Sequence, residues 1–106
     1  MMKVAVDIET EVWNTIISTL KADGWRLKYD YKGFDKGIDH DFLMLKKEKA
    51  YIYFGWTNWF EGEIKCSDNL FRYLSTTFQI TFCFGEPTAL KANVIQMEKI
   101  KSLFGL

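Results

Sequence analysis

The stretch that decides the fold reads Tyr51-Ile52-Tyr53-Phe54-Gly55-Trp56-Thr57-Asn58-Trp59-Phe60 and carries six aromatic side chains in ten residues. Successive side chains of a β-strand point to opposite faces of the sheet. Tyr51 and Tyr53 must therefore face away from Ile52 and Phe54, whichever face forms the core. Because both faces carry aromatic rings, we expect a helix, another subunit or a ligand to cover the second face.

The same stretch predicts a β-hairpin with a three-residue loop at Trp56-Thr57-Asn58, in which Asn58 is left-handed. This register pairs residue 54 with 60, 52 with 62 and 50 with 64, so that apolar side chains share one face. Tyr51 and Tyr53 then share the other face with Glu61 and Glu63. A two-residue loop would instead place apolar residues opposite these glutamates, so the three-residue loop is the preferred interpretation.

A helix and two strands are predicted ahead of the hairpin. Apolar residues at helical spacing predict a helix over residues 9–23, with Gly24 as its left-handed cap. Alternating apolar and charged residues over 25–31 predict a strand with one buried face. After a loop over residues 32–37, a second strand is predicted over 38–46, and its later half has apolar residues on both faces.

Two helices and one strand are predicted after the hairpin. Ser67 or Asp68 is suited to cap a short helix that runs to about Thr76. The alternation over residues 78–84 is the most regular in the chain and predicts a strand in which Cys83 is a small apolar residue. A last helix is predicted over residues 88–104, with an apolar stripe made of Leu90, Val94, Met97, Ile100 and Phe104.

The order of these elements, α-β-β-β-β-α-β-α, predicts an α+β domain of two layers. Short turns between consecutive strands favour a mostly antiparallel five-stranded sheet, with both long helices packed on one face. A chain of 106 residues that is 48% hydrophobic suffices for a single domain over residues 1–106. Only its first and last few residues are expected to be disordered.

The charge balance of the chain argues against a polyanionic partner. There are 14 basic and 14 acidic residues, and Arg26 and Arg72 are the only arginines. Without an overall positive charge, neither nucleic acid nor an anionic membrane is an expected partner. The longest uncharged apolar run, residues 50–59, is well short of the roughly 20 residues that cross a bilayer.

The two cysteines, Cys66 and Cys83, have no spacing typical of a disulfide framework and are expected to be free thiols. The apolar run Val4–Val6 is too short for a secretory signal. A cytoplasmic protein is therefore expected.

His40, the only histidine, lies between two aspartates, which strand alternation directs to the opposite face. An ordinary, partly exposed histidine is therefore expected rather than a metal ligand, and nothing marks Cys66 and His40 as a nucleophile and base. Lys32-Gly33-Phe34 is similar to the opening of an RNA-recognition consensus, but Asp35 replaces the small residue required next. No cofactor or catalytic residue is predicted.

Part of the aromatic hairpin is a candidate contact surface for another protein. Core packing accounts for many of the rings, yet burial is hardest near the turn, and tryptophan and tyrosine beside charged residues are favoured in protein interfaces. The order of elements is similar to that of small two-layer chaperone and immunity-type binding proteins, a likeness of fold alone. We therefore expect a non-enzymatic protein-binding module, acting on a partner protein or on a second copy of itself. Its predicted contact residues are Tyr51, Tyr53, Trp56, Trp59, Glu61 and Glu63.

The alternative is a small-molecule-binding protein or an enzyme with a pocket between sheet and helices. Tyr51, Tyr53 and Trp59 would line this pocket. Its polar groups would come from Glu61, Glu63 or His40.

Overall fold

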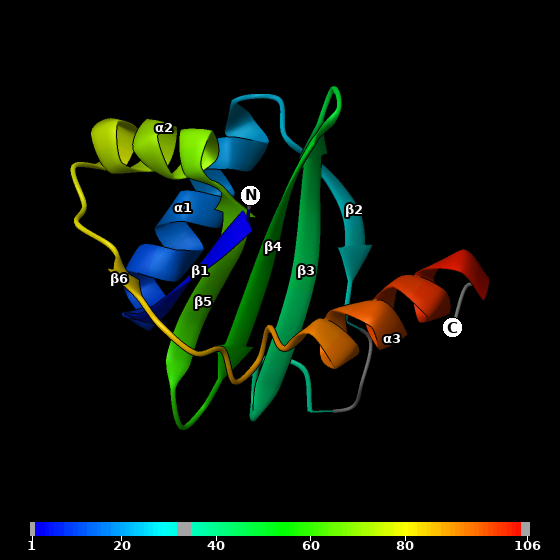
Figure 1. Cartoon of the computed structure of the whole chain (residues 1–106). Coiled ribbons are helices and arrows are strands. Elements are labelled where there is room, and N and C mark those ends of the chain that lie inside the picture. The colour runs from blue at the N-terminus through cyan, green and yellow to red at the C-terminus, as the bar shows by residue number, and fades with distance from the viewer. Residues whose placement is uncertain (1, 32–34, 105–106) are drawn as a thin grey trace.

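The computed structural model describes residues 2–31 and 35–104, which form an antiparallel sheet of six strands with three helices (Figure 1). The strands are β1 (Met2–Ile8), β2 (Arg26–Asp30), β3 (His40–Lys47), β4 (Ala50–Thr57), β5 (Glu61–Ser67) and β6 (Cys83–Phe84). Their order across the sheet is β2-β3-β4-β5-β1-β6. The helices are α1 (Thr10–Ala22), α2 (Asp68–Phe78) and α3 (Ala92–Phe104).

The predicted α+β class and the antiparallel sheet with a helical layer on it are confirmed. α1 and α2 cover one face of the sheet, which carries the larger core (Figure 1). The prediction that both long helices share that face is wrong. Ile95 of α3 packs with Phe42 and Tyr53 in a second, smaller core, whereas Trp13 of α1 packs with Phe54. The second face of the aromatic strand is thus partly covered by α3.

α1 forms where the helical spacing predicts it. Trp13, Ile16, Ile17 and Leu20 are buried against the sheet. Gly24 follows the helix at φ 93°, a conformation that suits glycine. The Trp25 amide then donates to the Leu20 carbonyl at 3.0 Å, which satisfies an end carbonyl of the helix and turns the chain into β2.

β1 is the element that the sequence pattern missed, and it lies between β5 and β6. The expected disorder of the first residues is wrong, because Met2–Ile8 is a strand paired with β5. The pairing register shifts between Ala5 and Ile8, and Asp7 lies in the shift at φ 56°. This bulge lets both Ala5 and Ile8 reach the larger core, although regular alternation would send them to opposite faces.

A similar irregularity lies in β2. Leu27 pairs with Leu45, and Tyr29 pairs with Met44. Two steps along β2 thus correspond to one step along β3. The shift turns Tyr29 to the face that α3 covers, while Trp25 is buried beneath α1. The predicted single buried face over 25–31 is therefore wrong.

The two faces of β3 agree with the sequence pattern. Its later half is buried on both faces, as predicted, through Phe42, Leu43, Met44 and Leu45. Of the loop predicted over residues 32–37, residues 32–34, and with them the similarity to an RNA-recognition motif, lie outside the described residues. Asp35 and Gly37 lie in turns.

α2 begins as predicted and ends later. The Ser67 hydroxyl accepts a hydrogen bond from the Leu70 amide at 3.3 Å, which caps the first turn. The helix then continues to Phe78, and Gln79 ends it in the left-handed conformation at φ 54°. Phe78 therefore belongs to the helix and not to the strand predicted over 78–84.

β6 consists of only two residues, although the alternation over 78–84 is so regular. Cys83 and Phe84 pair with β1. Ile80 and Phe82 pack against the larger core from a segment that forms no strand. Alternation here reflects packing of a connecting segment onto the core. Cys83 is exposed on this segment.

α3 starts at Ala92 rather than at residue 88. Of the predicted stripe, Leu90 is buried ahead of the helix and Val94 is half-buried, but the next two residues are not buried. Ile95 and Glu98 are buried, whereas Met97, Ile100 and Leu103 are exposed, Leu103 to 83%. A polar contact orients the helix: the Tyr29 hydroxyl donates to Glu98 Oε2 at 2.6 Å, so the side of α3 that carries Glu98 faces the sheet. Burial and the Glu98 carboxylate raise the pKa of Tyr29. The side chain of Phe104 lies outside the described residues.

Packing between Trp13 and the sheet depends on Gly62. A Cβ at Gly62 would lie 2.5 Å from Trp13 Cδ1 and 3.0 Å from the Ile8 carbonyl oxygen. We predict that Gly62→Ala lowers the free energy of unfolding by about 1–3 kcal/mol, because the ring must move away from the sheet. Urea denaturation measures the change. Asn14→Ala, at an exposed site of α1, is the control and should change stability by less than about 0.5 kcal/mol. Equal stability of both variants would contradict this packing.

Candidate functional site

The hairpin of β4 and β5 differs in register from the prediction. Phe54 lies opposite Ile64, and Thr57 lies opposite Glu61, so the turn consists of residues 58–60. Glu61 takes the left-handed conformation, at φ 58°, that was expected of Asn58. The predicted pairs are therefore wrong: each β4 residue lies opposite a β5 residue four positions later than predicted. Because that shift is even, Phe54 still faces the larger core and Tyr53 the opposite face, as predicted.

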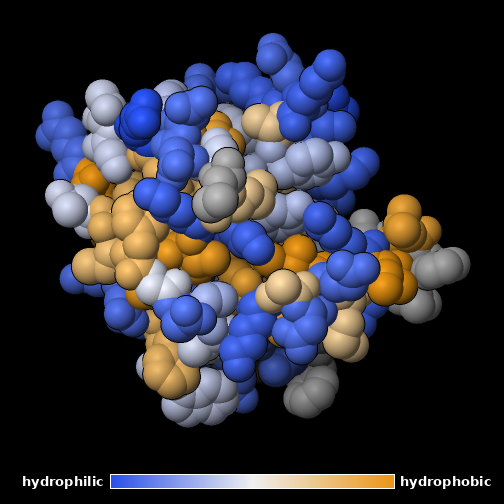
Figure 2. Space-filling view, in the orientation of Figure 1, coloured by the Kyte–Doolittle hydropathy of each residue, from blue (hydrophilic) through white to orange (hydrophobic). Residues whose placement is uncertain are grey.

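The turn exposes two adjacent aromatic side chains. Trp59 is 69% exposed and Phe60 is 55% exposed. Ile38, which is also exposed, lies in the neighbouring loop, where the Asp39 carbonyl accepts a hydrogen bond from the Asn58 amide at 3.1 Å. We call Ile38, Trp59 and Phe60 the tip surface. It lies at the end of the β4–β5 hairpin, the lower end of the molecule in Figure 2.

Trp56 and Glu61 hold the hairpin to α1. Trp56 Nε1 donates to the Thr10 hydroxyl at 2.9 Å. Glu61 Oε1 accepts from both the amide and the hydroxyl of Thr10, each at 3.2 Å. Glu9, at the start of α1, makes no capping bond with its own side chain, so Glu61 supplies the negative charge that favours a helix N-terminus. Both residues therefore stabilise the fold.

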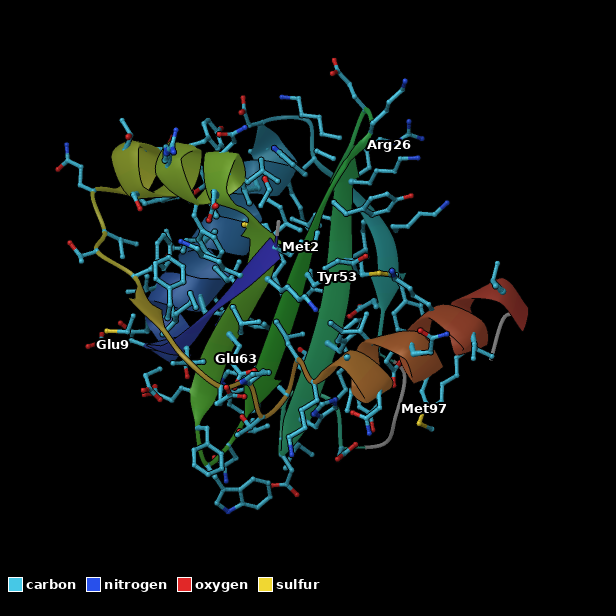
Figure 3. All side chains as sticks on the ribbon, viewed as in Figure 1. Met2, Glu9, Arg26, Tyr53, Glu63 and Met97 are labelled. Carbon is cyan, nitrogen blue, oxygen red and sulfur yellow. The ribbon has the colours of Figure 1, made fainter. Side chains whose placement is uncertain are left out.

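Glu63 is a buried carboxylate that binds the backbone of a distant segment. It is 1% exposed and lies where the segment before α3 crosses the sheet (Figure 3). Its oxygens accept from the Thr88 amide at 2.9 Å, the Thr88 hydroxyl at 2.6 Å and the Leu90 amide at 3.0 Å. These bonds satisfy two backbone amides of the segment that leads into α3. Glu63 has no exposed surface to offer a partner.

Tyr51 and Tyr53 line a cleft between the sheet and α3. Its volume is about 330 Å³, and its lining residues are Lys28, Met44, Tyr51, Tyr53, Lys99 and Leu103. The two tyrosine rings are nearly parallel, with an interplanar angle of 11° and centroids 6.4 Å apart. Tyr53 is buried and Tyr51 is half-buried. We call this space the tyrosine cleft.

His40 and the two cysteines lie apart from the tyrosine cleft. The His40 ring packs edge-on against Tyr31, with centroids 4.8 Å apart. Among the described residues, no three histidine, cysteine or acidic side chains are grouped as metal ligands. Cys66 is buried in the core, Cys83 is exposed, and both are free thiols as predicted.

The structure divides the six predicted contact residues among three places. Trp59 is exposed at the tip surface, Tyr51 and Tyr53 line the tyrosine cleft, and Trp56, Glu61 and Glu63 make internal hydrogen bonds. Sequence reasoning missed Ile38 beside the turn and the two lysines of the cleft. Lys28 follows from no local pattern, because the β2 bulge shifts the pairing there. Lys99 lies on α3, and the Tyr29–Glu98 hydrogen bond decides which side of α3 faces the sheet.

Comparisons with protein-family models, with curated proteins and with solved structures gave no significant match. The function is therefore inferred from the residues of this chain. Within the part of the chain that the structure describes, no helix has both the length and the apolar character needed to cross a membrane.

The bonds of Glu63 lead to a prediction about stability. Glu63→Gln keeps one acceptor oxygen but places an NH₂ group either against the Leu90 amide or against the donors of Thr88. We expect the free energy of unfolding to fall by about 1–3 kcal/mol, since a buried donor is left without a partner. Chemical denaturation measures the loss, and hydrogen exchange at the Leu90 amide should become faster. Glu86→Gln, exposed in the same segment, is the control. Unchanged exchange at Leu90 would show that Glu63 does not hold the segment.

The cysteines allow a test of the core. We predict that one thiol, Cys83, reacts rapidly with an aromatic disulfide reagent in the native protein and that Cys66 reacts only after unfolding. Burial raises the pKa of Cys66 to about 12, so at pH 8 it is a protonated, poorly nucleophilic thiol as well as an inaccessible one. Cys83→Ser should abolish the fast phase. Two fast equivalents would contradict the burial of Cys66.

Proposed function

We propose that this protein is a non-enzymatic protein-binding module whose contact surface is the tip surface. The observation that carries the proposal is the 69% exposure of Trp59 beside an exposed Phe60. Exposed large apolar side chains that cluster mark interaction sites. Tryptophan in particular contributes much contact area and a polar N–H, and it is enriched among the residues that dominate binding energy.

The rigidity of the turn supports this proposal. The Phe60 amide donates to the Thr57 hydroxyl at 3.0 Å, and the Asn58 amide bonds to the loop beside it. Glu61 is bonded to Thr10 at the start of α1. Backbone held in this way loses little conformational entropy when a partner binds, so more of the contact energy is available for affinity.

The proposed partner is another protein or a second copy of this chain. Trp56, Glu61 and Glu63 take part by holding the hairpin and the segments around it, while Tyr51 and Tyr53 face a different region. Our prediction of a cytoplasmic location is supported by the two cysteine thiols, which are not bonded to each other.

Tryptophan fluorescence distinguishes the two kinds of partner. Trp13 and Trp25 are buried and Trp56 is half-buried, so iodide should quench Trp59 most strongly. Trp59→Phe should remove most of the quenchable emission. If the partner is a second copy, light scattering at two concentrations should show a dimer, and dilution should increase quenching. A monomer with readily quenched Trp59 indicates a different protein as partner, whereas a monomer with shielded Trp59 contradicts the tip surface.

Photo-crosslinking tests the proposal directly. A benzoylphenylalanine placed at Asn58, beside Trp59, should form a discrete adduct in cell extract, and the same group at Asn14 on α1 should not; both asparagines are exposed. Added wild-type protein should compete for the adduct, and the double variant Trp59→Ser, Phe60→Ser should not. The double variant should still fold, because both rings lie at the surface. Equal competition by the variant, or equal adducts from Asn14, would overturn the proposal.

A further inference from the structure

The tyrosine cleft, which contains Tyr53 (Figure 3), lies on the face of the sheet that α3 covers. The tip surface lies at the turn of the β4–β5 hairpin. β2, β3, β4 and α3 each supply side chains to the cleft: Lys28, then Met44, then Tyr51 and Tyr53, then Lys99 and Leu103. Met44, Leu103 and the two rings form an apolar lining, and the lysines add positive charge. A volume of about 330 Å³ is at the lower end of the range of small-molecule sites.

Positive charge accumulates around the tyrosines. Lys46 Nζ lies 5.3 Å from the centroid of the Tyr51 ring, and Lys99 Nζ lies 5.0 Å from that of Tyr53. Each ammonium group thus contacts the electron-rich face of an aromatic ring. A second hollow of about 530 Å³ shares Lys28 with the cleft and is also lined by Arg26, Leu27, Lys46 and Glu48.

The cations around the two hollows form no ion pairs, a property that they share with Lys21, Lys49, Lys65 and Lys91 among the described residues. Arg26 and Lys46 lie directly opposite each other on β2 and β3, an arrangement of like charges that is unfavourable in a sheet. Among the described residues, no carboxylate lies within 4.0 Å of the charged nitrogens of Arg26, Lys28, Lys46 or Lys99. Lys3, Lys36, Lys47 and Lys101 all form ion pairs. Among the lining residues that the structure describes, Glu48 is the one acidic side chain of the two hollows.

We propose that the tyrosine cleft binds a small organic anion, with a carboxylate or phosphate group on an apolar body. The anionic group binds Lys28 of β2 and Lys99 of α3, and it relieves the repulsion among the cations. The apolar body packs on Met44, Leu103 and the tyrosine rings. In the described residues the hydroxyls of Tyr51 and Tyr53 have no hydrogen-bond partner, so they can donate to the anion as well.

This proposal shares Tyr51 and Tyr53 with the small-molecule pocket that the sequence predicted as an alternative, but the polar groups of the site differ. The polar groups of the site are lysines, where glutamates or His40 were expected, and Trp59 lies outside it. Lysines favour a negatively charged ligand, whereas glutamates would have favoured a positively charged one. The proposal does not depend on the tip surface, so failure of either leaves the other standing.

Titration calorimetry with three related probes tests the proposal. 1-Naphthyl phosphate and 1-naphthoate carry the anion on the same apolar ring system, and 1-naphthylmethanol is the neutral control. We expect at least one anion to bind with a Kd of about 1 mM or tighter and the neutral probe to bind at least about tenfold more weakly. Preference for one anion tells whether the natural ligand is a phosphate ester or a carboxylic acid.

Lysine variants locate the binding site. Lys28→Gln and Lys99→Gln should each weaken anion binding about tenfold, as expected for the loss of one charge-assisted contact. Lys21→Gln, exposed on α1 and carrying the same change of charge, should leave binding unchanged. All three sites are exposed, so thermal unfolding should show folded variants. Equal binding of the neutral probe, absence of binding by both anions, or equal effects of Lys21→Gln and Lys99→Gln would each overturn the proposal.

Discussion

The buried carboxylate of Glu63 decides where the last part of the chain lies. It accepts hydrogen bonds from Thr88 and Leu90 and so holds this segment against the face of the sheet opposite α1 and α2. Gly55, opposite Glu63 on β4, leaves the necessary space: a Cβ there would lie 2.8 Å from the Leu90 side chain. α3 starts from this fixed point, so the second core and the tyrosine cleft both depend on one charged group being fully bonded in the interior.

Irregular strands distribute the aromatic residues between the two cores. A regular β2 would place Trp25 and Tyr29 on the same face, but its bulge buries Trp25 beneath α1 and turns Tyr29 toward Glu98 of α3. The bulge in β1 likewise brings Ile8 to the larger core. Bulges often redirect side chains in this manner. Together they allow a sheet of six short strands to be packed on both faces.

The two proposed surfaces are built on different physical principles. The tip surface is apolar and held by backbone hydrogen bonds, which suits a protein partner that buries a tryptophan. The tyrosine cleft combines aromatic rings with lysines that lack acidic partners, which suits a small anion. The overall charge of the chain is zero, so attraction for an anion arises only from the local arrangement of Lys28, Lys46 and Lys99.

The sequence alone determined what depends on local periodicity. The helix over 9–23 with its Gly24 cap, the Ser67 cap of α2 and the two buried faces of β3 follow from spacing within a few residues, and each is confirmed. The antiparallel order of β2 to β5 follows from short turns in the same way. The division of Phe54 and Tyr53 between opposite faces needed only the period of a strand.

The tertiary structure decided what depends on partners distant in the sequence. β1 became a strand because β5 and β6 flank it, and the segment over 78–84 remained mostly unpaired because it packs on a core instead. The hairpin register depended on Glu61 reaching Thr10, and the orientation of α3 on Tyr29 reaching Glu98. Such contacts join residues about 50 or more positions apart, so no local pattern contains them. For the same reason the tyrosines could be recognised from the sequence, but the lysines around them could not.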